Sequence, residues 1–181
     1  MKSDIELKIE IPQGVTVALN EGGLIIVKGP KGENKRVIRD AKVKFEIKDN
    51  KVMLRVAKAS KKEKSVINTY CKHIQNMIKG VIEGYVYKLK ICSGHFPMNV
   101  SVSGNKLIVK NFLGEKYPRT LDLKEGAKVN VEGNIISVEG IDREICGQTA
   151  GDIENLMRIT SRDRRIFQDG IYIIEKAGKS L

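Results

Sequence analysis

The second half of this 181-residue chain repeats the first half. Five segments recur in the same order about eighty residues later: the stretch that begins at Pro12 and the one at Pro97, then 27–33 (VKGPKGE) and 109–115 (VKNFLGE), 42–46 (KVKFE) and 128–132 (KVNVE), 50–54 (NKVML) and 134–138 (NIISV), and 74–78 (IQNMI) and 153–157 (IENLM). One such match is noise, but five in register indicate a duplicated unit. We therefore expect two tandem units, residues 1–82 and 83–181.

Alternating apolar and polar residues predict short strands in each unit. The stretch 5–11 (IELKIEI) places its apolar residues on one face, as expected of a strand that is buried on one side. Residues 15–19 and 43–47 alternate in the same way. The segments 103–105 (SGN) and 132–134 (EGN) contain residues that tolerate positive φ in tight turns. Antiparallel hairpins are the simplest connection between strands this short.

One helix is predicted after the strands of each unit. The first begins with a capping box at 60–63 (SKKE) and ends at Gly80. Its apolar face consists of Ile67, Tyr70, Cys71, Ile74 and Ile78. The second begins at Asp142, and its buried residues are expected to be Ile145, Thr149, Ile153 and Leu156.

Strands followed by a helix favour the α+β class over a parallel sheet. The predicted architecture is two tandem duplicated units, each a small, mostly antiparallel sheet with one main helix. Gly147 and Gly151 weaken the second helix by about 1 kcal/mol each relative to alanine. We interpret them as sites of close approach to a sheet or to a partner's backbone.

The chain has a formal net charge of +11. Like charges repel in a folded domain, so this excess indicates a polyanionic partner, either nucleic acid or an anionic membrane surface. A merely soluble basic protein is the alternative. No segment predicts a secretory signal or a membrane span, and three widely spaced cysteines argue against a disulfide framework. We expect a cytoplasmic protein with no membrane partner.

Residues that would support catalysis are sparse. The glycine loops at 29–32 and 113–115 lack the P-loop pattern, so they predict hairpin turns, with backbone contact to RNA phosphate as the alternative. The histidines are His73 and His95, and Ser93 near His95 lies on an extended segment without an oxyanion loop. We expect no enzymatic activity, no cofactor, no metal and no small-molecule substrate. His95 is expected to be a structural residue at the junction of the units or an RNA contact.

The arginine-rich tail is the strongest local signal for RNA binding. Four arginines precede two aromatic residues: Arg158, Arg162, Arg164 and Arg165, then Phe167 and Tyr172. A guanidinium group can bind two phosphate oxygens and stack on bases. The alternative is a solvated helix C-terminus, where cations stabilise the dipole. Asp169 and Gly170 are predicted to form a turn before a closing strand at 171–174.

A strand with a basic face is predicted at 85–91 (YVYKLKI). It would either join the two units or be an ordinary strand of the second. Together with the continuation HFPMNV at 95–100 and the tail motif RDRRIFQDGIY at 162–172, it gives the chain a resemblance to a known family. The chain resembles the archaeal and eukaryotic branch of the large-subunit ribosomal protein six family over essentially its whole length. Asn155 departs from the pattern, because the family's tail motif usually begins with Gln.

The resemblance implies a structural constituent of the large ribosomal subunit that supports translation. Its partners would be large-subunit rRNA, near the base of the factor-binding stalk and the sarcin–ricin loop, and neighbouring ribosomal proteins. The second unit would be the main RNA anchor, and the first a more peripheral basic arm. The RNA-binding residues would be Lys88, Lys90, His95, Lys110, Lys116, Tyr117, Arg119, Arg158, Arg162, Arg164, Arg165 and Lys176. A free-standing RNA- or DNA-binding module and an enzyme on a duplicated scaffold are the alternatives.

Overall fold

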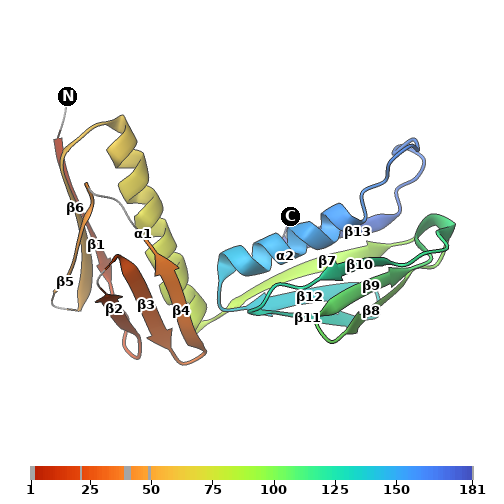
Figure 1. The fold of residues 1–181 in the computed structure, drawn as a ribbon, viewed down its shortest axis with the longest axis horizontal. Coiled ribbons are helices and arrows are strands. Elements are labelled where there is room, and N and C mark those ends of the chain that lie inside the picture. The colour runs from red at the N-terminus through yellow and green to blue at the C-terminus, as the bar shows by residue number, and fades with distance from the viewer. Residues whose placement is uncertain (1–2, 21, 39–41, 49, 181) are drawn as a thin grey trace. The chain divides into compact units, whose positions relative to one another are not determined.

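The computed structural model describes residues 3–20, 22–38, 42–48 and 50–180 (Figure 1). The chain divides into two compact units, Met1–Gly84 and Tyr85–Leu181, which we call unit 1 and unit 2. This division lies two residues beyond the boundary that the sequence predicts. Each unit contains short antiparallel strands and one long helix, so the predicted α+β class with duplicated units is confirmed.

Unit 1 contains six strands followed by a helix. They are β1 (Ser3–Glu10), β2 (Thr16–Asn20), β3 (Leu24–Gly29), β4 (Gly32–Val37), β5 (Lys44–Lys48), β6 (Lys51–Ala59) and α1 (Lys61–Ile82). The strands form two antiparallel sheets with the orders β1-β6-β5 and β2-β3-β4. The helix packs against both sheets, and residues such as Leu54, Ile67 and Ile74 are fully buried between them.

Unit 2 repeats this order and adds two strands at its end. It contains β7 (Tyr85–Cys92), β8 (Asn99–Ser103), β9 (Lys106–Lys110), the 3-10 turn η1 (Phe112–Gly114), β10 (Arg119–Asp122), β11 (Ala127–Glu132), β12 (Ile135–Gly140), α2 (Arg143–Leu156), β13 (Gly170–Lys176) and β14 (Lys179–Ser180). The sheet orders are β10-β9-β8 and β11-β12-β7-β13-β14. The equivalent of unit 1's β1-β6-β5 is therefore β7-β12-β11, extended by two further strands.

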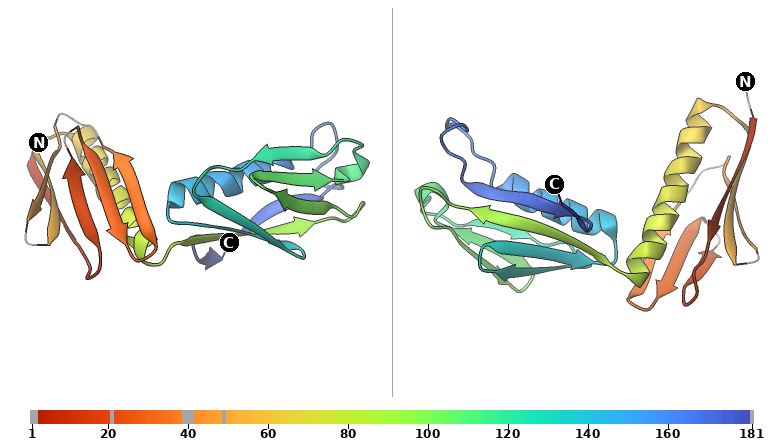
Figure 2. Two further views of the ribbon diagram at one scale, coloured as in Figure 1. Left: turned by 60° about the horizontal axis from the view of Figure 1, so that its bottom comes forward. Right: turned by 180° about the vertical axis from the view of Figure 1, so that it is seen from behind.

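The core of unit 2 is aliphatic, and Phe112 is the only ring among its most deeply buried described residues. Leu89, Leu107 and Ile136 of the strands meet Ile153 of α2 with no exposed surface. The helix packs on β7, β12 and β13 (Figure 2). Segment 85–91 is thus an ordinary strand of unit 2, in the middle of its larger sheet.

The capping box of α1 forms as predicted. The N–H of Ser60 donates to the carboxylate of Glu63 (2.9 Å), and the Ser60 hydroxyl contacts the same carboxylate. Lys42 Nζ donates to it as well (2.7 Å), and these hydrogen bonds, that of Lys42 first, lower the pKa of Glu63 to about 2.

The predicted end of α1 is wrong, because the helix continues past Gly80 to Ile82. Gly84, with φ +75°, follows the helix and leads into β7. These last two residues are stabilised by Val81, which is fully buried against Gly29 and whose carbonyl accepts from the N–H of Lys31 (3.0 Å). The first glycine loop forms the predicted β3–β4 hairpin turn. It also packs against the end of α1, because a Cβ on Gly29 would lie 2.7 Å from Cγ2 of Val81.

The start of α2 is also confirmed, since the Asp142 carboxylate accepts from the N–H of Glu144 (2.7 Å). Its buried stripe differs slightly from the prediction. Thr149 and Ile153 are buried, but Cys146 and Ala150 fill the other positions, while Ile145 and Leu156 are half-buried. Gly147 approaches the sheet, because a Cβ there would lie 3.1 Å from the hydroxyl of Tyr87, whereas nothing lies within 4 Å of a Cβ on Gly151.

Candidate nucleic-acid interface

Three loops of unit 2 meet at one end of the unit (Figure 1). They are residues 93–98 after β7, 111–118 between β9 and β10, and 157–169 between α2 and β13. We call them the loop cluster. Asn111 donates to the carbonyl of Pro97 (3.0 Å), and the ring of Phe96 packs against Gly114. Segments that are far apart in the sequence therefore form one surface.

The predicted hairpin turn at 113–115 is confirmed, because this segment connects the antiparallel strands β9 and β10. The connection is a longer loop that contains the 3-10 turn Phe112–Gly114, and Asn111 and Leu113 have left-handed φ values of 61° and 49°. Phe112 is 1% exposed, so its ring anchors the start of this loop in the core. The loop beyond it carries Lys116 and Tyr117, and Tyr117 is 84% exposed.

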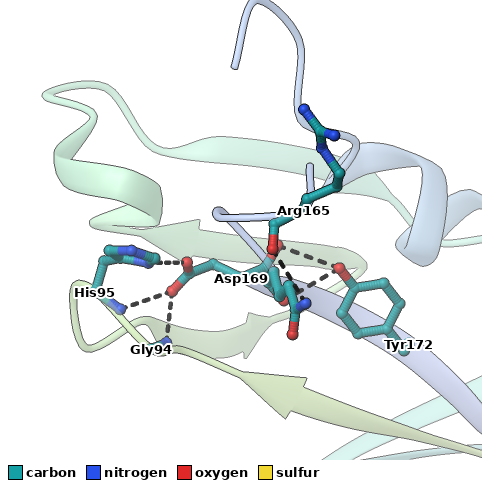
Figure 3. A network of polar contacts seen from close by, with 6 residues as sticks. Gly94, His95, Arg165, Asp169 and Tyr172 are labelled. Atoms are coloured by element: carbon teal, nitrogen blue, oxygen red, sulfur yellow. Dashed lines mark hydrogen bonds and ion pairs between the residues drawn. The ribbon is translucent and has the colours of Figure 1, made fainter. Parts of the chain in front are cut away.

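Asp169 joins the first loop to the third (Figure 3). Its Oδ1 accepts from the backbone N–H groups of Gly94 (2.6 Å) and His95 (2.9 Å), and its Oδ2 lies 2.5 Å from Nδ1 of His95. The predicted turn at Asp169–Gly170 is therefore wrong, because Asp169 is buried and Gly170 already begins β13. Nδ1 of His95 is thus engaged within the protein, while 38% of the His95 side chain remains exposed.

The ionisation of Asp169 follows from these contacts. Burial opposes the charged form, but the hydrogen bonds from His95 and Gly94 outweigh burial and lower the pKa of the carboxyl below its ordinary value. A carboxylate that accepts several hydrogen bonds in a 2% exposed position holds its neighbours firmly. The loop cluster is consequently anchored by a charged group that does not itself face solvent.

Phe167 lies next to this anchor. Its ring centroid is 4.7 Å from that of His95, and the guanidinium carbon of Arg162 lies 4.9 Å from the ring centroid. An arginine over an aromatic face is held by a cation–π interaction that leaves its N–H groups available. The Arg162 guanidinium is thus presented, in a defined place, on an exposed loop.

Arg119 differs from the other predicted contacts because its guanidinium already has partners within the protein. It forms an ion pair with Glu115 (2.6 Å), donates to the carbonyl of Leu156 at the end of α2 (2.6 Å) and lies over the ring of Phe112. The same guanidinium reaches the carbonyl of Arg158 (3.4 Å). Arg119 connects the second loop of the cluster to the third.

The remaining arginines are more exposed. Arg165 pairs with Asp163 (2.8 Å), a hydrogen bond that lowers the pKa of Asp163. Within the described part of the chain, Arg158, Arg162 and Arg164 form no ion pair with an acidic side chain. Arg158 directly follows the C-cap Met157 of α2, whereas Arg162, Arg164 and Arg165 lie farther along the loop, so a helix end accounts for Arg158 at most. Both aspartates of the loop are already paired, which leaves a cationic surface.

The predicted lysines are divided between the cluster and the sheet. Lys110 ends β9 at the edge of the cluster. Lys88 pairs with Glu175 across β7 and β13 (2.8 Å), and Lys90 lies opposite Tyr172 in the same pair of strands. Lys176 ends β13, away from the loops. The structure therefore brings together nine predicted residues and leaves Lys88, Lys90 and Lys176 along the strands.

A hollow of about 620 Å³ adjoins the third loop. We call it the tail hollow. Its polar and aromatic lining consists of Glu154, Asn155, Arg158, Arg164, Arg165, Phe167 and Tyr172. Sequence analysis missed the hollow and the role of Asp169. The role of Asp169 could have been suspected from the sequence, because it is an acidic residue in a mainly basic motif and lies two positions after Phe167.

The described residues were compared with the requirements of a membrane helix, a metal site and a disulfide. No helix among them is long and apolar enough to cross a membrane. Nor do they include a group of three His, Cys, Asp or Glu side chains that could hold a metal ion. The three cysteines are free thiols, and burial raises the pKa of Cys146 to about 11.

Comparisons with known proteins agree with this picture. The family model described as Ribosomal protein L6 matches residues 11–84 and 96–170, one match in each unit. The large ribosomal subunit protein uL6 of Methanococcus vannielii is 46% identical over 177 residues, which cover 98% of this chain and 97% of that protein. The family consists of structural proteins and not of enzymes, as the sequence predicts. Membership of this family also agrees with the predicted location in the cytoplasmic ribosome. The chain belongs to the ribosomal protein L6 family.

Proposed function

We propose that this protein is a structural constituent of the large ribosomal subunit and that unit 2 is its main rRNA anchor, near the base of the factor-binding stalk and the sarcin–ricin loop. The observation that carries the proposal is the group of three arginines, Arg158, Arg162 and Arg164, which form no ion pair with an acidic side chain among the described residues. Guanidinium groups on one exposed loop suit the closely spaced phosphates of folded RNA.

The anchor under the loop supports this assignment. Binding costs conformational entropy when a flexible loop must become ordered, and a preformed loop avoids part of that cost. Asp169, His95 and Phe167 hold the third loop against the first through hydrogen bonds and ring contact. A basic loop with this internal support is suited to a rigid, charged partner.

The predicted residues divide by role in this proposal. Arg158, Arg162, Arg164, Arg165, Lys110, Lys116 and Tyr117 contact rRNA. His95 and Arg119 position the loops, because Nδ1 of His95 contacts Asp169 and the Arg119 guanidinium binds Glu115 and the carbonyl of Leu156. Lys88, Lys90 and Lys176 form a secondary contact along β7 and β13.

Sedimentation tests the assignment to the large subunit. Tagged protein is incubated with large subunits of Methanococcus vannielii from which the resident relative has been removed, and the mixture is run on a sucrose gradient. Co-migration that survives a moderate salt wash supports the proposal. Protein that remains at the top of the gradient in low salt overturns it, and binding to any RNA without preference for the subunit favours a free-standing RNA-binding module.

The location on the subunit is tested by directed cleavage. An iron–EDTA probe is attached to Lys116→Cys in the loop cluster and, as the matched control, to Lys61→Cys at the exposed start of α1. The proposal expects hydroxyl-radical cuts at the sarcin–ricin loop and the stalk base from the first probe, and weaker or different cuts from the second. Cuts confined to other rRNA regions would overturn the location and leave subunit binding intact.

A further inference from the structure

We propose that the tail hollow holds one unpaired nucleotide of the bound RNA. This inference rests on the proposed rRNA binding and names the ligand of one site within it. The hollow measures about 620 Å³, within the range of sites that enclose a small ligand. It lies between the end of α2, the 164–167 segment and the first residues of β13.

The charge of the lining selects an anion. Arg158, Arg164 and Arg165 supply three guanidinium groups, of which that of Arg165 is paired with Asp163. The acidic residue of the lining is Glu154, and its Oε1 accepts from the N–H of Ile173 on the edge of β13 (3.2 Å). That carboxylate is therefore turned to the strand, and the positive charge of the hollow remains in excess. A phosphate group meets this requirement.

The aromatic residues select a planar group beside the anion. Phe167 and Tyr172 both line the hollow. Tyr172 is 42% exposed, and its hydroxyl donates to the carbonyl of Gln168 (3.2 Å), which holds the ring beside Gly170 (Figure 3). Proteins bind unpaired RNA bases by stacking them on aromatic rings or guanidinium planes. A nucleotide combines this planar group with the phosphate.

The lining also offers groups that can bind the edge of a base. Asn155 is exposed and lines the hollow, and its amide has both donors and an acceptor. This side chain can therefore bind the edge of a base that enters the hollow.

Photocrosslinking identifies the occupant. The full chain with Tyr172→p-benzoylphenylalanine is bound to deproteinised large-subunit rRNA from Methanococcus vannielii and irradiated. The matched control has the same change at Tyr117, a more exposed tyrosine outside the hollow. The proposal expects one unpaired nucleotide to be crosslinked from position 172 and a different site from position 117. Diffuse crosslinks from position 172, in a complex that forms normally, overturn the hollow as a nucleotide site.

An abasic RNA gives the decisive measurement. The rRNA fragment around the crosslinked nucleotide is synthesised with and without that base, and its affinity is measured for the wild type, Tyr172→Leu and Arg158→Gln. We expect loss of the base and Tyr172→Leu each to weaken binding by about tenfold or more. Combined, they should weaken it no further, because both remove the same contact.

The outcomes separate this inference from the proposed function. If the abasic site and Tyr172→Leu together weaken affinity by the product of their separate effects, the two changes remove different contacts. That result would overturn the hollow as the binding site of the base and leave rRNA binding intact. Failure of the wild type to bind the intact RNA would overturn the proposed function itself. Arg158→Gln changes an exposed side chain, so it tests the phosphate contact even if Tyr172→Leu perturbs the fold. Unchanged affinity of Arg158→Gln would overturn the phosphate contact that this site requires.

Discussion

Oδ2 of Asp169 lies 2.5 Å from Nδ1 of His95, and the contact joins residues that are 74 positions apart. One carboxylate thereby orders two loops, because its other oxygen accepts the N–H groups of Gly94 and His95. The arginines that we assign to RNA lie on the loop that ends at Asp169. Their positions depend on a residue that RNA does not touch in our proposal.

Removing this carboxylate should loosen the loop cluster. Asp169→Ala leaves two backbone N–H groups and the His95 ring without their acceptor, so we expect the free energy of unfolding of unit 2 to fall by about 3 kcal/mol. Hydrogen exchange of the β7 amides measures this change, and the amides of Gly94 and His95 should exchange faster. Asp163→Ala is the matched control, since Asp163 is an exposed aspartate of the same loop. Equal effects of the two variants would contradict the role of Asp169.

The capping box of α1 should make the stability of unit 1 depend on pH. The folded-state pKa of Glu63, about 2, lies below its ordinary value of 4.5. The charged carboxylate therefore stabilises the fold above pH 4.5, and this contribution is lost as the pH falls toward 2. Urea unfolding of the full chain should show Glu63→Gln less stable than the wild type at pH 6, with the difference shrinking below pH 4. Glu132→Gln, an exposed glutamate of unit 2, controls for loss of one charge. A difference that is the same at pH 6 and pH 3 would be inconsistent with this assignment.

The arginine loop should determine the salt dependence of rRNA binding. Combined Arg162→Ala, Arg164→Ala and Arg165→Ala should weaken affinity and reduce the slope of log K against log salt by roughly 2 to 3, because each lost phosphate contact changes it by about 0.7–0.9. Filter binding at salt concentrations from about 50 to about 300 mM measures this slope. The control removes the same charge from unit 1 through Lys61→Ala, Lys62→Ala and Lys64→Ala. An equal change of slope in the control would indicate that binding follows total charge alone.

The two glycines of α2 should respond differently to alanine. Gly151→Ala adds a methyl group where nothing lies within 4 Å, so it should stabilise unit 2 by about 1 kcal/mol through helix propensity. Gly147→Ala should stabilise less or destabilise, because its Cβ would lie 3.1 Å from the Tyr87 hydroxyl, which is bonded to the carbonyl of Arg143. Thermal unfolding of the two variants side by side measures this. A larger gain from Gly147→Ala than from Gly151→Ala would be incompatible with the packing of Tyr87.

Local patterns in the sequence predicted the elements well, and tertiary contacts account for the errors. The alternation at 5–11 and the capping box at Ser60 depend on neighbouring residues, so they could be read directly. The end of α1 could not, because Gly80 and Gly84 are both plausible stops and burial of Val81 against Gly29 decides between them. Sequence patterns do not show which glycine lies against which helix.

The same distinction applies to the site. Arginine density and the nearby aromatic residues predicted an RNA-binding segment, and the structure places its arginines on the third loop of the cluster. The occupied guanidinium of Arg119 was not predictable, since one of its acceptors is a backbone carbonyl of Leu156 that any residue could provide. Net charge alone would point to unit 1, in contrast to our proposal. Residues 1–84 contain 18 Lys and Arg against 10 Asp and Glu, a net charge of +8, whereas residues 85–181 contain 15 against 12, a net charge of +3.

The pairing of β7 with β13 has a consequence for how the protein is made. Unit 1 is complete once residue 84 has been synthesised, so it can fold while the rest of the chain is still being translated. The first strand of unit 2 can pair with β12 on one side, but its other side must wait for β13, which begins at Gly170. Such a long-range pairing is slow to form because the intervening chain must first be closed into a loop. A product that ends before Gly170 would therefore lack the β7–β13 pair, and with it the support of the surface that we propose as the RNA anchor.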